Sequence, residues 1–465
     1  MLKKIKTIFS WHNLPLFIFF VFCLFIFFRF TNLHLRIPFA WDQEQFSNQV
    51  KEIISDHKLT LLGPRVTNER GFFLAPYFSY LLVPFYLLFN LDPNALILFI
   101  VTVNFVFFTT TAFVLSRIFN MRYAMIFLLL WSINPLLIKY DTTPWWPVLI
   151  PIGVVIIWYL LFSIYKKPHN MFSWVLLGAT VGFFSNMHFQ FVFMAIYAGI
   201  FLIIHFSNKI IEQWKYILIG LASCASMFLP LLVFDLRHNF LNSKLFMTFF
   251  TERVLDDLPY PIEWLRVLAN ALNPITGWNH PIMTILFLAL FYMMLRYLIK
   301  RKKGYVQTMY KSTLILIIAT AIGFSVYGIR PSEYYFVYLY PFIYVVLVDF
   351  FHIYKKYRLL PHFLFLYFMV LNSIALKNSV NADPNGLYYR KQFIKHIIPY
   401  AKDKKVNVTF DMPLGTNNGY IYLLEISGVH RTGDWNDPLI IIRVPPQKGD
   451  IVIRDIGLRI PPELK

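Results

Sequence analysis

Two carboxylates separated by one residue, Asp42 and Glu44, follow the first long apolar run of the chain. Trp41 precedes them, and a polar stretch continues to about residue 71. A carboxylate at a desolvated membrane edge can act as a general base once its pKa rises. The plain alternative is a structural one, because Asp42 and Gln45 have the spacing of a helix-capping box. At this point Asp42 has two compatible roles, cap and base, and Glu44 is the alternative base.

Two further polar clusters lie between apolar runs. Asp141, followed by Trp145 and Trp146, is suited to face the acidic pair and to offer tryptophan rings to a sugar; the alternative is an aromatic belt around a proline turn. His188 and Gln190 form a polar break between two apolar runs. They are candidate binding residues, and a hydrogen-bonded packing histidine is the plain alternative.

Cations at the predicted outer ends of spans are a third kind of candidate. Arg237 and His238 break the usual clustering of cations on the cytoplasmic side, and a guanidinium is a natural partner for phosphate. Arg330 and Tyr334 lie in another outer loop and are candidates for the same ligand. The alternatives are an interfacial anchor at Arg237 and an ion pair of Arg330 with Glu333.

Composition defines the solvent in which these residues act. Of the 465 residues, 58% are hydrophobic, and the mean hydropathy is +0.56. A soluble domain of this length cannot bury so much apolar surface, so the chain is predicted to be a polytopic membrane protein. The net charge of +19 comes largely from short basic loops between apolar runs, which set orientation and indicate no nucleic acid partner. Cys23 and Cys224 lie inside apolar runs and predict neither a disulfide nor a metal site.

Twelve apolar runs are candidate membrane spans. If the basic loops are cytoplasmic, the acidic loop 31–71 lies outside. A loop outside and a loop in the cytoplasm must be separated by an odd number of spans. However, two apolar runs lie between the acidic loop and the basic pair Arg117 and Arg122. Either one run does not span or this basic loop is outside, so we expect 11 to 13 spans. The runs are 13–30, 72–90, 95–116, 121–139, 147–165, 172–186, 188–206, 215–234, 281–299, 311–329, 333–351 and 360–377.

The predicted fold class is therefore an all-α polytopic membrane protein with a small C-terminal soluble α/β appendage. Residues 1–377 form the transmembrane module, and residues 378–465 form a soluble domain outside the cytoplasm. In the first outer loop, Phe46, Val50 and Ile54 predict an amphipathic surface helix. In the appendage we expect a helix and several strands. These are a helix over 390–402 and strands over Val406–Phe410, Tyr420–Leu424, Leu439–Arg443 and Asp450–Arg454.

Five motifs in a fixed order carry a family resemblance. They are Trp41-Asp42-Gln43-Glu44, Arg70 to Tyr77, Asp141 to Pro147, the Gly-containing run Gly178 to Gln190, and the tyrosines Tyr334, Tyr335, Tyr338 and Tyr340 before Pro341. With these motifs the chain resembles the C-type superfamily of lipid-linked-sugar glycosyltransferases, in particular the branch of protein O-mannosyltransferases and aminoarabinose transferases. The resemblance covers about residues 10–377. This chain departs from the Asp-Glu dipeptide of that branch, because Gln43 separates the two carboxylates.

The resemblance implies an enzyme that moves a sugar from a polyprenyl-phosphate donor to an acceptor hydroxyl, with inversion, on the outer face of the cell membrane. Asp42 would be the base, with Glu44 as the alternative. Arg237 and His238 would contact the phosphate, and Arg65, Arg70 and Arg330 are further candidates for this contact. The acceptor is unknown: a protein, a lipid or a glycan. The other partners are membrane lipids, and we expect no cofactor and no metal.

Two other functions compete with this one. A transporter or flippase would place ionisable groups near the bilayer midplane, often within an internal repeat. Here the polar clusters lie at span ends on one face, and no repeat is visible. A surface-polysaccharide polymerase or ligase shares the lipid-phosphate substrate and stays open.

Overall fold

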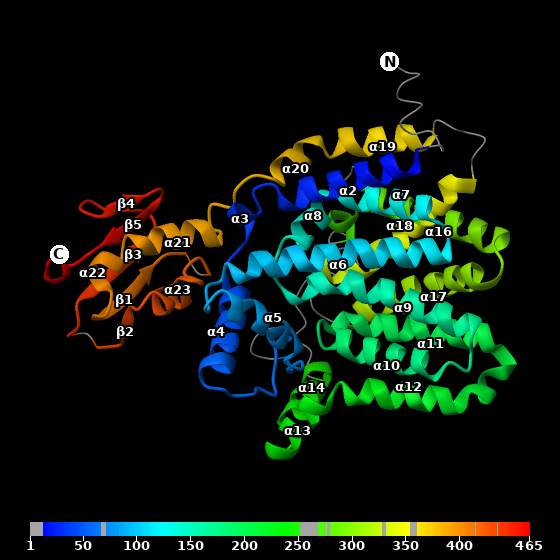
Figure 1. Cartoon of the computed structure of the whole chain (residues 1–465), viewed down its shortest axis with the longest axis horizontal. Coiled ribbons are helices and arrows are strands. Elements are labelled where there is room, and N and C mark those ends of the chain that lie inside the picture. The colour runs from blue at the N-terminus through cyan, green and yellow to red at the C-terminus, as the bar shows by residue number, and fades with distance from the viewer. Residues whose placement is uncertain are drawn as a thin grey trace.

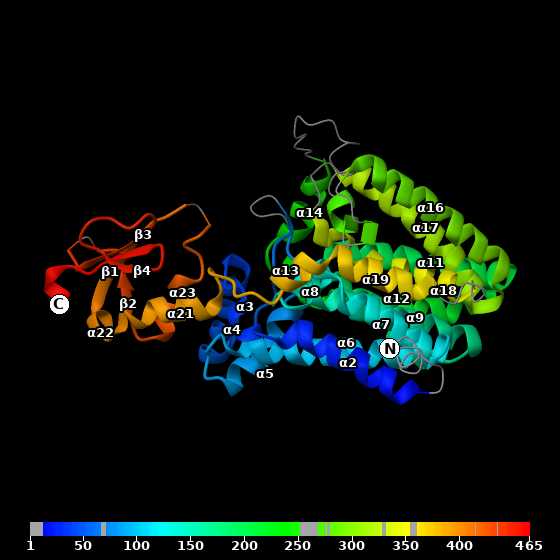
Figure 2. The ribbon, with the colours of Figure 1, turned by 90° about the horizontal axis from the view of Figure 1, so that it is seen from above.

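The computed structural model describes residues 13–66, 71–251, 268–273, 275–276, 280–327, 332–353, 360–413, 415–434 and 436–465. Long helices form one large body, and a small sheet with its own helices lies beside one end of it (Figures 1 and 2). The long helices are α2 (Leu14–Phe30), α6 (Ala95–Ile118), α7 (Met121–Ser132), α9 (Ile150–Lys166), α10 (Met171–Ser185), α11 (Val192–Phe206), α12 (Trp214–Ser226), α16 (Pro281–Arg301), α17 (Gly304–Tyr327), α18 (Tyr340–Ile353) and α19 (Leu360–Leu371).

The other helices of this body connect these and carry most of the candidate residues. They are α3 (Leu33–Arg36), α4 (Trp41–Ser55), α5 (Tyr77–Leu88), α8 (Pro135–Asp141), α13 (Leu229–Arg237), α14 (Leu241–Thr251), α20 (Ser373–Asn378) and the 3₁₀ helices η2 (Trp146–Leu149), η3 (Phe189–Phe191), η4 (Ser207–Gln213) and η5 (Glu333–Leu339). The amphipathic helix predicted in the first loop is confirmed as α4.

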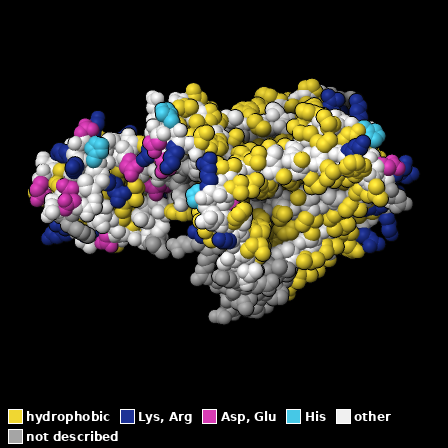
Figure 3. Space-filling model, turned by 90° about the horizontal axis from the view of Figure 1, so that it is seen from below, with side chains coloured by type: hydrophobic (Ala, Val, Ile, Leu, Met, Phe, Trp, Pro, Cys, Tyr) yellow, Lys and Arg dark blue, Asp and Glu magenta, His cyan; other side chains and the backbone are white. Residues whose placement is uncertain are grey.

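The surface of the helical body is apolar. In the described part, six helices are long and apolar enough to cross a bilayer, or eight if each of two bent pairs is one span. The structure also has three shorter apolar helices in these residues, α2, α5 and α10, and the predicted 11 spans would be reached only if all three crossed the bilayer. Leu221 and Leu290 are 60% and 54% exposed, and hydrophobic side chains cover most of the visible face of this body (Figure 3). So large an exposed apolar area is stable against lipid, so the chain is a multi-pass membrane protein.

Helix α5 explains the conflict in the predicted span count. Its 12 residues rise only ~18 Å, short of the ~30 Å hydrocarbon core. It packs along α4, where Ser47 Oγ lies 2.5 Å from Tyr86 Oη and the Phe46 and Phe78 rings meet at 4.7 Å. Both helices lie at the end of the body that faces the sheet (Figures 1 and 2). The run 72–90 therefore belongs to the loop layer, and of the two runs in question only α6 crosses.

The polar break predicted near His188 is confirmed. Helix α10 ends at Ser185, and η3 begins at Phe189. The N–H of Ala75 donates to Asn186 Oδ1 at 3.0 Å, so the loop before α5 is attached to this break. The break thus joins the first loop to the middle of the chain.

The C-terminal domain contains a five-stranded sheet of order β2-β1-β3-β5-β4, parallel between β1 and its two neighbours and antiparallel elsewhere. Three of the predicted strands are confirmed as β1, β3 and β4. The helix predicted over 390–402 is found as two helices. The elements are α21 (Leu387–Lys395), α22 (Ile398–Ala401), β1 (Lys405–Asp411), α23 (Tyr420–Ile426), β2 (His430–Thr432), β3 (Leu439–Arg443), β4 (Ile451–Ile453), β5 (Ile456–Arg459) and η6 (Pro462–Leu464).

The strand predicted over Tyr420–Leu424 is wrong, because this segment is helix α23. Its aromatic and branched residues suggested a strand, yet Tyr420, Leu423 and Leu424 are buried at helical spacing. Gly419 precedes the helix with φ +88°, a conformation that glycine adopts readily. Tertiary contacts that start the helix, described below, outweigh the local preference.

Candidate active site

The first turn of α4 begins two residues earlier than a cap at Asp42 requires. Ala40 is the N-cap residue, and its N–H donates to Gln43 Oε1 at 3.1 Å. The Gln43 amide donates at 3.1 Å to the carbonyl of Pro144, which fixes the turn against the loop after α8. The cap role predicted for Asp42 is therefore wrong: Asp42 is the second residue of the helix, and Gln43 makes the capping contact.

Asp42 is a half-buried carboxylate with no hydrogen bond or ion pair to any residue that the structure describes. Burial raises its pKa from 3.8 to about 6. Its charge acts on the hydroxyl of Tyr334 in η5, so the two side chains are neighbours across nearly 300 residues of sequence. A carboxylate that is desolvated, unpaired and titrates near neutral pH has the properties of a general base.

Aromatic rings gather around Tyr334. The ring centroids of Trp145 and Tyr334 are 4.6 Å apart, and those of His188 and Tyr334 are 5.6 Å apart. The structure thus brings together four of the predicted residues, Asp42, Trp145, His188 and Tyr334, which we call the Asp42 cluster. Trp146 lies alongside it and packs on Phe46 of α4 at 5.0 Å.

Within the Asp42 cluster, two polar groups define its chemistry. His188 is buried, and its Nδ1 accepts the backbone N–H of Gln190 at 3.4 Å. The Nε1–H of Trp145 is buried and has no hydrogen-bond partner among the described residues. The Gln190 side chain is half-buried beside this histidine. These groups are candidates to hydrogen-bond a sugar beside the carboxylate.

Glu44 has a different environment from Asp42, although the two residues share one helical turn. Successive residues of an α-helix are rotated by about 100°, so the side chains of Asp42 and Glu44, two residues apart, point to nearly opposite faces. The Glu44 carboxylate is buried and accepts the N–H groups of Gly419 at 2.8 Å and Tyr422 at 3.0 Å. Both donors belong to the start of α23. The lone pairs of Glu44 are thus used by the C-terminal domain.

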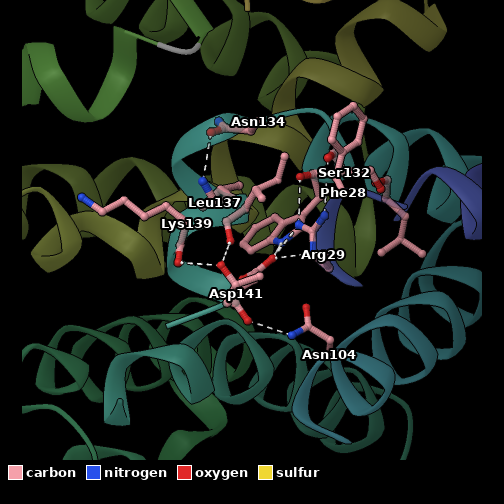
Figure 4. Close-up of polar contacts among 12 residues, drawn as sticks. Phe28, Arg29, Asn104, Ser132, Asn134, Leu137, Lys139 and Asp141 are labelled. Atoms are coloured by element: carbon pink, nitrogen blue, oxygen red, sulfur yellow. Dashed lines mark hydrogen bonds and ion pairs between the residues drawn. The ribbon is translucent and has the colours of Figure 1, made fainter. Parts of the chain in front are cut away.

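Asp141 is also satisfied within the protein (Figure 4). Its Oδ2 accepts Arg29 Nε at 2.9 Å, Arg29 Nη2 at 2.5 Å and Trp131 Nε1 at 2.8 Å. Arg29 is fully buried and donates further to the carbonyls of Trp131 and Ser132. This cluster ties α2 to the bend of 88° between α7 and α8. Sequence reasoning did not single out Arg29, although a cation inside an apolar run was a signal.

The predicted cations lie apart from Asp42. Arg237 and His238 are exposed at the end of α13, and no contact joins them to Asp42 in the described part of the chain. The helical hairpin α13–α14 that carries them rests on the first loop, where Asn242 exchanges hydrogen bonds of 2.7 and 3.1 Å with the backbone of Phe73. Arg330 lies outside the described residues. Among the residues described, no three His, Cys, Asp or Glu side chains come together as a metal site.

An apolar cavity of about 90 Å³ lies along η5, the 3₁₀ helix that also carries Tyr334. This 3₁₀ helix begins beside Tyr334 and reaches the cavity two residues later with Phe336. Thr320 lines the cavity and bonds its hydroxyl to that of Tyr338 at 2.7 Å. The remaining lining comes from α16, α17, α18 and the segment around residue 270, among them Leu272, Phe287, Phe291, Ile317, Phe342 and Ile343.

The arrangement of the whole chain matches solved structures. ArnT from Cupriavidus metallidurans, in the apo state, aligns with a TM-score of 0.60 at 12% identity, over 96% of this chain and 97% of ArnT. The oligosaccharyltransferase of Archaeoglobus fulgidus, in a complex with Zn and sulfate, aligns with a TM-score of 0.53 at 10% identity, over 90% of this chain and 62% of its own. This chain has the C-type glycosyltransferase fold.

The C-type fold confirms the predicted resemblance and the predicted fold class. ArnT bound to undecaprenyl phosphate aligns equally well, with a TM-score of 0.61 at 12% identity over 96% of this chain and 97% of that one. No protein-family model and no curated protein matches the sequence. The likeness to these glycosyltransferases therefore lies in the arrangement of the helices rather than in sequence identity.

Proposed function

We propose that this chain is an integral-membrane glycosyltransferase. It moves a sugar from a polyprenyl-phosphate donor to an acceptor hydroxyl, with inversion, outside the cytoplasm, and Asp42 is the general base. The observation that carries the proposal is the contrast among the acidic residues around the first loop. Glu44 and Asp141 are bonded within the protein, whereas Asp42 is unpaired, desolvated and beside Tyr334. Glu44, the alternative base in the sequence, is set aside because its oxygens are occupied.

The donor fits the surroundings of Asp42. The cavity along η5 is apolar, and its volume of about 90 Å³ suits a short part of a prenyl chain, while the sugar lies at the Asp42 cluster at the start of the same helix. Trp145 offers an aromatic face, and His188 and Gln190 offer polar groups. The likeness to an ArnT structure that holds undecaprenyl phosphate supports a lipid-phosphate donor.

The phosphate requires cations near the outer membrane surface. Arg237 and His238 are exposed on a hairpin anchored to the first loop, and Arg330 directly precedes the segment that carries Tyr334. We keep these three as the proposed phosphate contacts. Negative charge grows on the leaving phosphate during sugar transfer, so cations there stabilise the transition state.

The proposed step balances with one base and no cofactor. Asp42 accepts the proton of the acceptor hydroxyl while the acceptor oxygen attacks the anomeric carbon. The bond from that carbon to the phosphate oxygen breaks, and polyprenyl phosphate leaves with the electron pair. Attack from the face opposite the phosphate inverts the anomeric centre. Burial of Asp42 holds its pKa at about 6, close enough to neutral pH for a general base.

The test uses the purified full-length chain in proteoliposomes with a panel of radiolabelled polyprenyl-phosphate sugars and a membrane extract as acceptor source. Sugar incorporation and release of polyprenyl phosphate are both measured. We expect both products from at least one donor, and loss of both with Asp42→Asn. Asp56→Asn, an exposed aspartate at the end of the same helix, is the matched control.

Two outcomes contradict the proposal. Activity that depends on a soluble nucleotide sugar removes the lipid-phosphate donor. Unchanged transfer by a well-folded Asp42→Asn variant removes Asp42 as the base.

A further inference from the structure

We propose that the C-terminal domain is a brace for the catalytic helix, and that Glu44 is the positioning residue through which it acts on Asp42. The inference rests on the proposed function, because it takes Asp42 to be the base. It explains what the C-terminal domain does, although none of its described side chains belongs to the Asp42 cluster. It gives the second carboxylate of the acidic pair a purpose distinct from that of the first.

The central contact joins Glu44 to the start of α23. Its two oxygens accept one N–H each, from Gly419 at 2.8 Å and Tyr422 at 3.0 Å. The first N–H groups of a helix have no partner inside the helix, so a carboxylate at this point satisfies them with charge-assisted bonds. Because the contact is buried, loss of the Glu44 carboxylate would leave the two backbone N–H groups without a hydrogen-bond acceptor.

The fit around this contact is close. Gly419 approaches the first loop so tightly that an added Cβ would lie 2.2 Å from the carbonyl oxygen of Phe39. The Tyr422 ring packs on Phe39, with centroids 6.0 Å apart, and its hydroxyl donates to the carbonyl of Leu91 at 2.6 Å. These close contacts fix the position of the C-terminal domain relative to the first loop.

Further contacts surround the Glu44 carboxylate. Lys51, two turns along α4, pairs with Glu425 of α23 at 2.5 Å. The N–H of Leu387, at the start of α21, donates to the carbonyl of Ile37 at 2.8 Å. Lys391 in α21 pairs with Asp92 at 2.6 Å. Exposed ion pairs contribute little to stability by themselves, so the buried Glu44 contact is the one expected to hold α4.

The two faces of α4 thus have different partners. On one face Phe46 packs on Trp146, Gln43 bonds to Pro144, and Asp42 lies in its cluster. On the other face Glu44 and Lys51 hold the C-terminal domain. A 15-residue helix is marginal in isolation. Clamping it from both sides fixes the position of Asp42 to the accuracy that catalysis requires.

The test compares Glu44→Gln with Glu52→Gln in the full-length chain. Glu52 is an exposed glutamate on the same helix with no described partner, so it is the matched control. The glutamine amide keeps one acceptor oxygen for one N–H donor and presents its NH₂ group to the other. We expect Glu44→Gln to speed amide hydrogen exchange in residues 41–46 and 419–424 by about tenfold or more. Glu52→Gln leaves exchange in both segments at the wild-type rate.

The kinetic readout separates positioning from general instability. In Glu44→Gln we expect kcat to fall roughly tenfold with little change in the donor KM, because the base is displaced while donor contacts remain. The acid limb of the pH profile should move below pH 6, because a loosened α4 admits water to Asp42. A smaller amount of active enzyme would leave the limb in place.

Exchange in residues 41–46 that matches the Glu52→Gln control overturns the brace, whatever the activity. An acid limb that stays at the wild-type position in Glu44→Gln overturns the link to Asp42. If Glu44→Gln does not fold, Glu44→Asp is measured in the same way, since it retains the charge but is one methylene too short to reach both N–H groups. Hydrogen exchange requires no turnover, so the brace is tested even if the proposed function fails.

Discussion

The first turn of α4 and the end of α8 offer a comparison between two aspartates that look alike in sequence. Asp42 follows a tryptophan, and Asp141 lies just before a pair of tryptophans. Asp141 accepts three hydrogen bonds from Arg29 and Trp131, whereas Asp42 accepts none from the described residues. Asp141 lies at a junction of three helices, and Asp42 lies near Tyr334 at the start of η5.

The difference shows what separates a paired carboxylate from an unpaired one. Removing water from a carboxylate costs free energy, and a buried cation with hydrogen-bond donors offsets that cost. Asp141 has such a partner, so its charge stabilises the bend between α7 and α8. Asp42 lacks one, so its desolvation appears as a raised pKa. Proximity to aromatic residues is common to both and does not distinguish them.

The largest effect expected from this comparison is on activity. Asp42→Asn should lower sugar transfer by about 10³-fold, the usual range for loss of a general base, while the protein stays folded. Asp141→Asn should not reproduce this loss once activity is corrected for the amount of folded protein. Initial rates with a polyprenyl-phosphate sugar, normalised to the monodisperse peak on gel filtration, provide the measurement. Equal losses in the two folded variants would erase the distinction between them.

The second prediction concerns the stability of the Arg29 cluster. Asp141→Asn should destabilise the protein by about 3–5 kcal/mol, because it leaves the buried guanidinium of Arg29 uncompensated. Thermal unfolding in detergent measures the loss. The double variant Arg29→Met/Asp141→Leu should recover most of it, since both charges are then absent. A double variant no more stable than Asp141→Asn would argue against this pair as the cause.

The third prediction is a pH profile. A base must be deprotonated, and burial holds the pKa of Asp42 at about 6 instead of 3.8. We expect kcat/KM to be constant above pH 7 and to fall tenfold per pH unit below pH 6. Measurements between pH 4.5 and 8.5 in mixed buffers give the limb. An inflection near pH 4 would mean that Asp42 is solvated in the working enzyme.

The smallest expected effect is a gain in stability. Because the folded-state pKa of Asp42 is raised, the folded chain binds this proton more tightly than the unfolded chain. Stability from this group is present below about pH 4 and is lost as pH rises through about 6. Asp42→Asn should therefore stabilise the protein by roughly 1 kcal/mol at pH 8 and by clearly less at pH 4.5. Melting curves at the two pH values decide, and a gain at pH 4.5 as large as at pH 8 would contradict the charge argument.

Much of the fold was predictable because it follows from local composition. Apolar runs of about 20 residues predict helices in lipid. The break before Phe189 was predicted from a short group of polar residues, and the strand β3 from its β-branched residues. The helix α23 was missed because Glu44 and a positive φ at Gly419 initiate it, and neither shows in its own residues. The run 72–90 was predicted to span the membrane, but it contains the short helix α5. Its apolar residues are explained by packing against other helices and do not require a full crossing of the bilayer.

Among the site residues, those at the first loop and at η5 were predicted as separate clusters, and only the structure joined Asp42, Trp145, His188 and Tyr334. The exposed Arg237 and His238 stay a prediction. Arg29 lies inside an apolar run, and its structural role depends on its hydrogen bond to Asp141, which is 112 residues away in the sequence. No local pattern contains that distance.

The sequence by itself determined that this protein lives in a bilayer, since hydrophobicity is a property of each side chain and adds along the chain. It also determined that polar chemistry lies at the ends of helices, because charges inside lipid are costly. Only the tertiary structure decided which of these carboxylates lacks a hydrogen-bond or ion-pair partner among the described residues. Charge pairing depends on contacts between segments hundreds of residues apart: Glu44 meets Tyr422, Asp141 meets Arg29, and Asp42 meets neither a cation nor a backbone donor in the described chain.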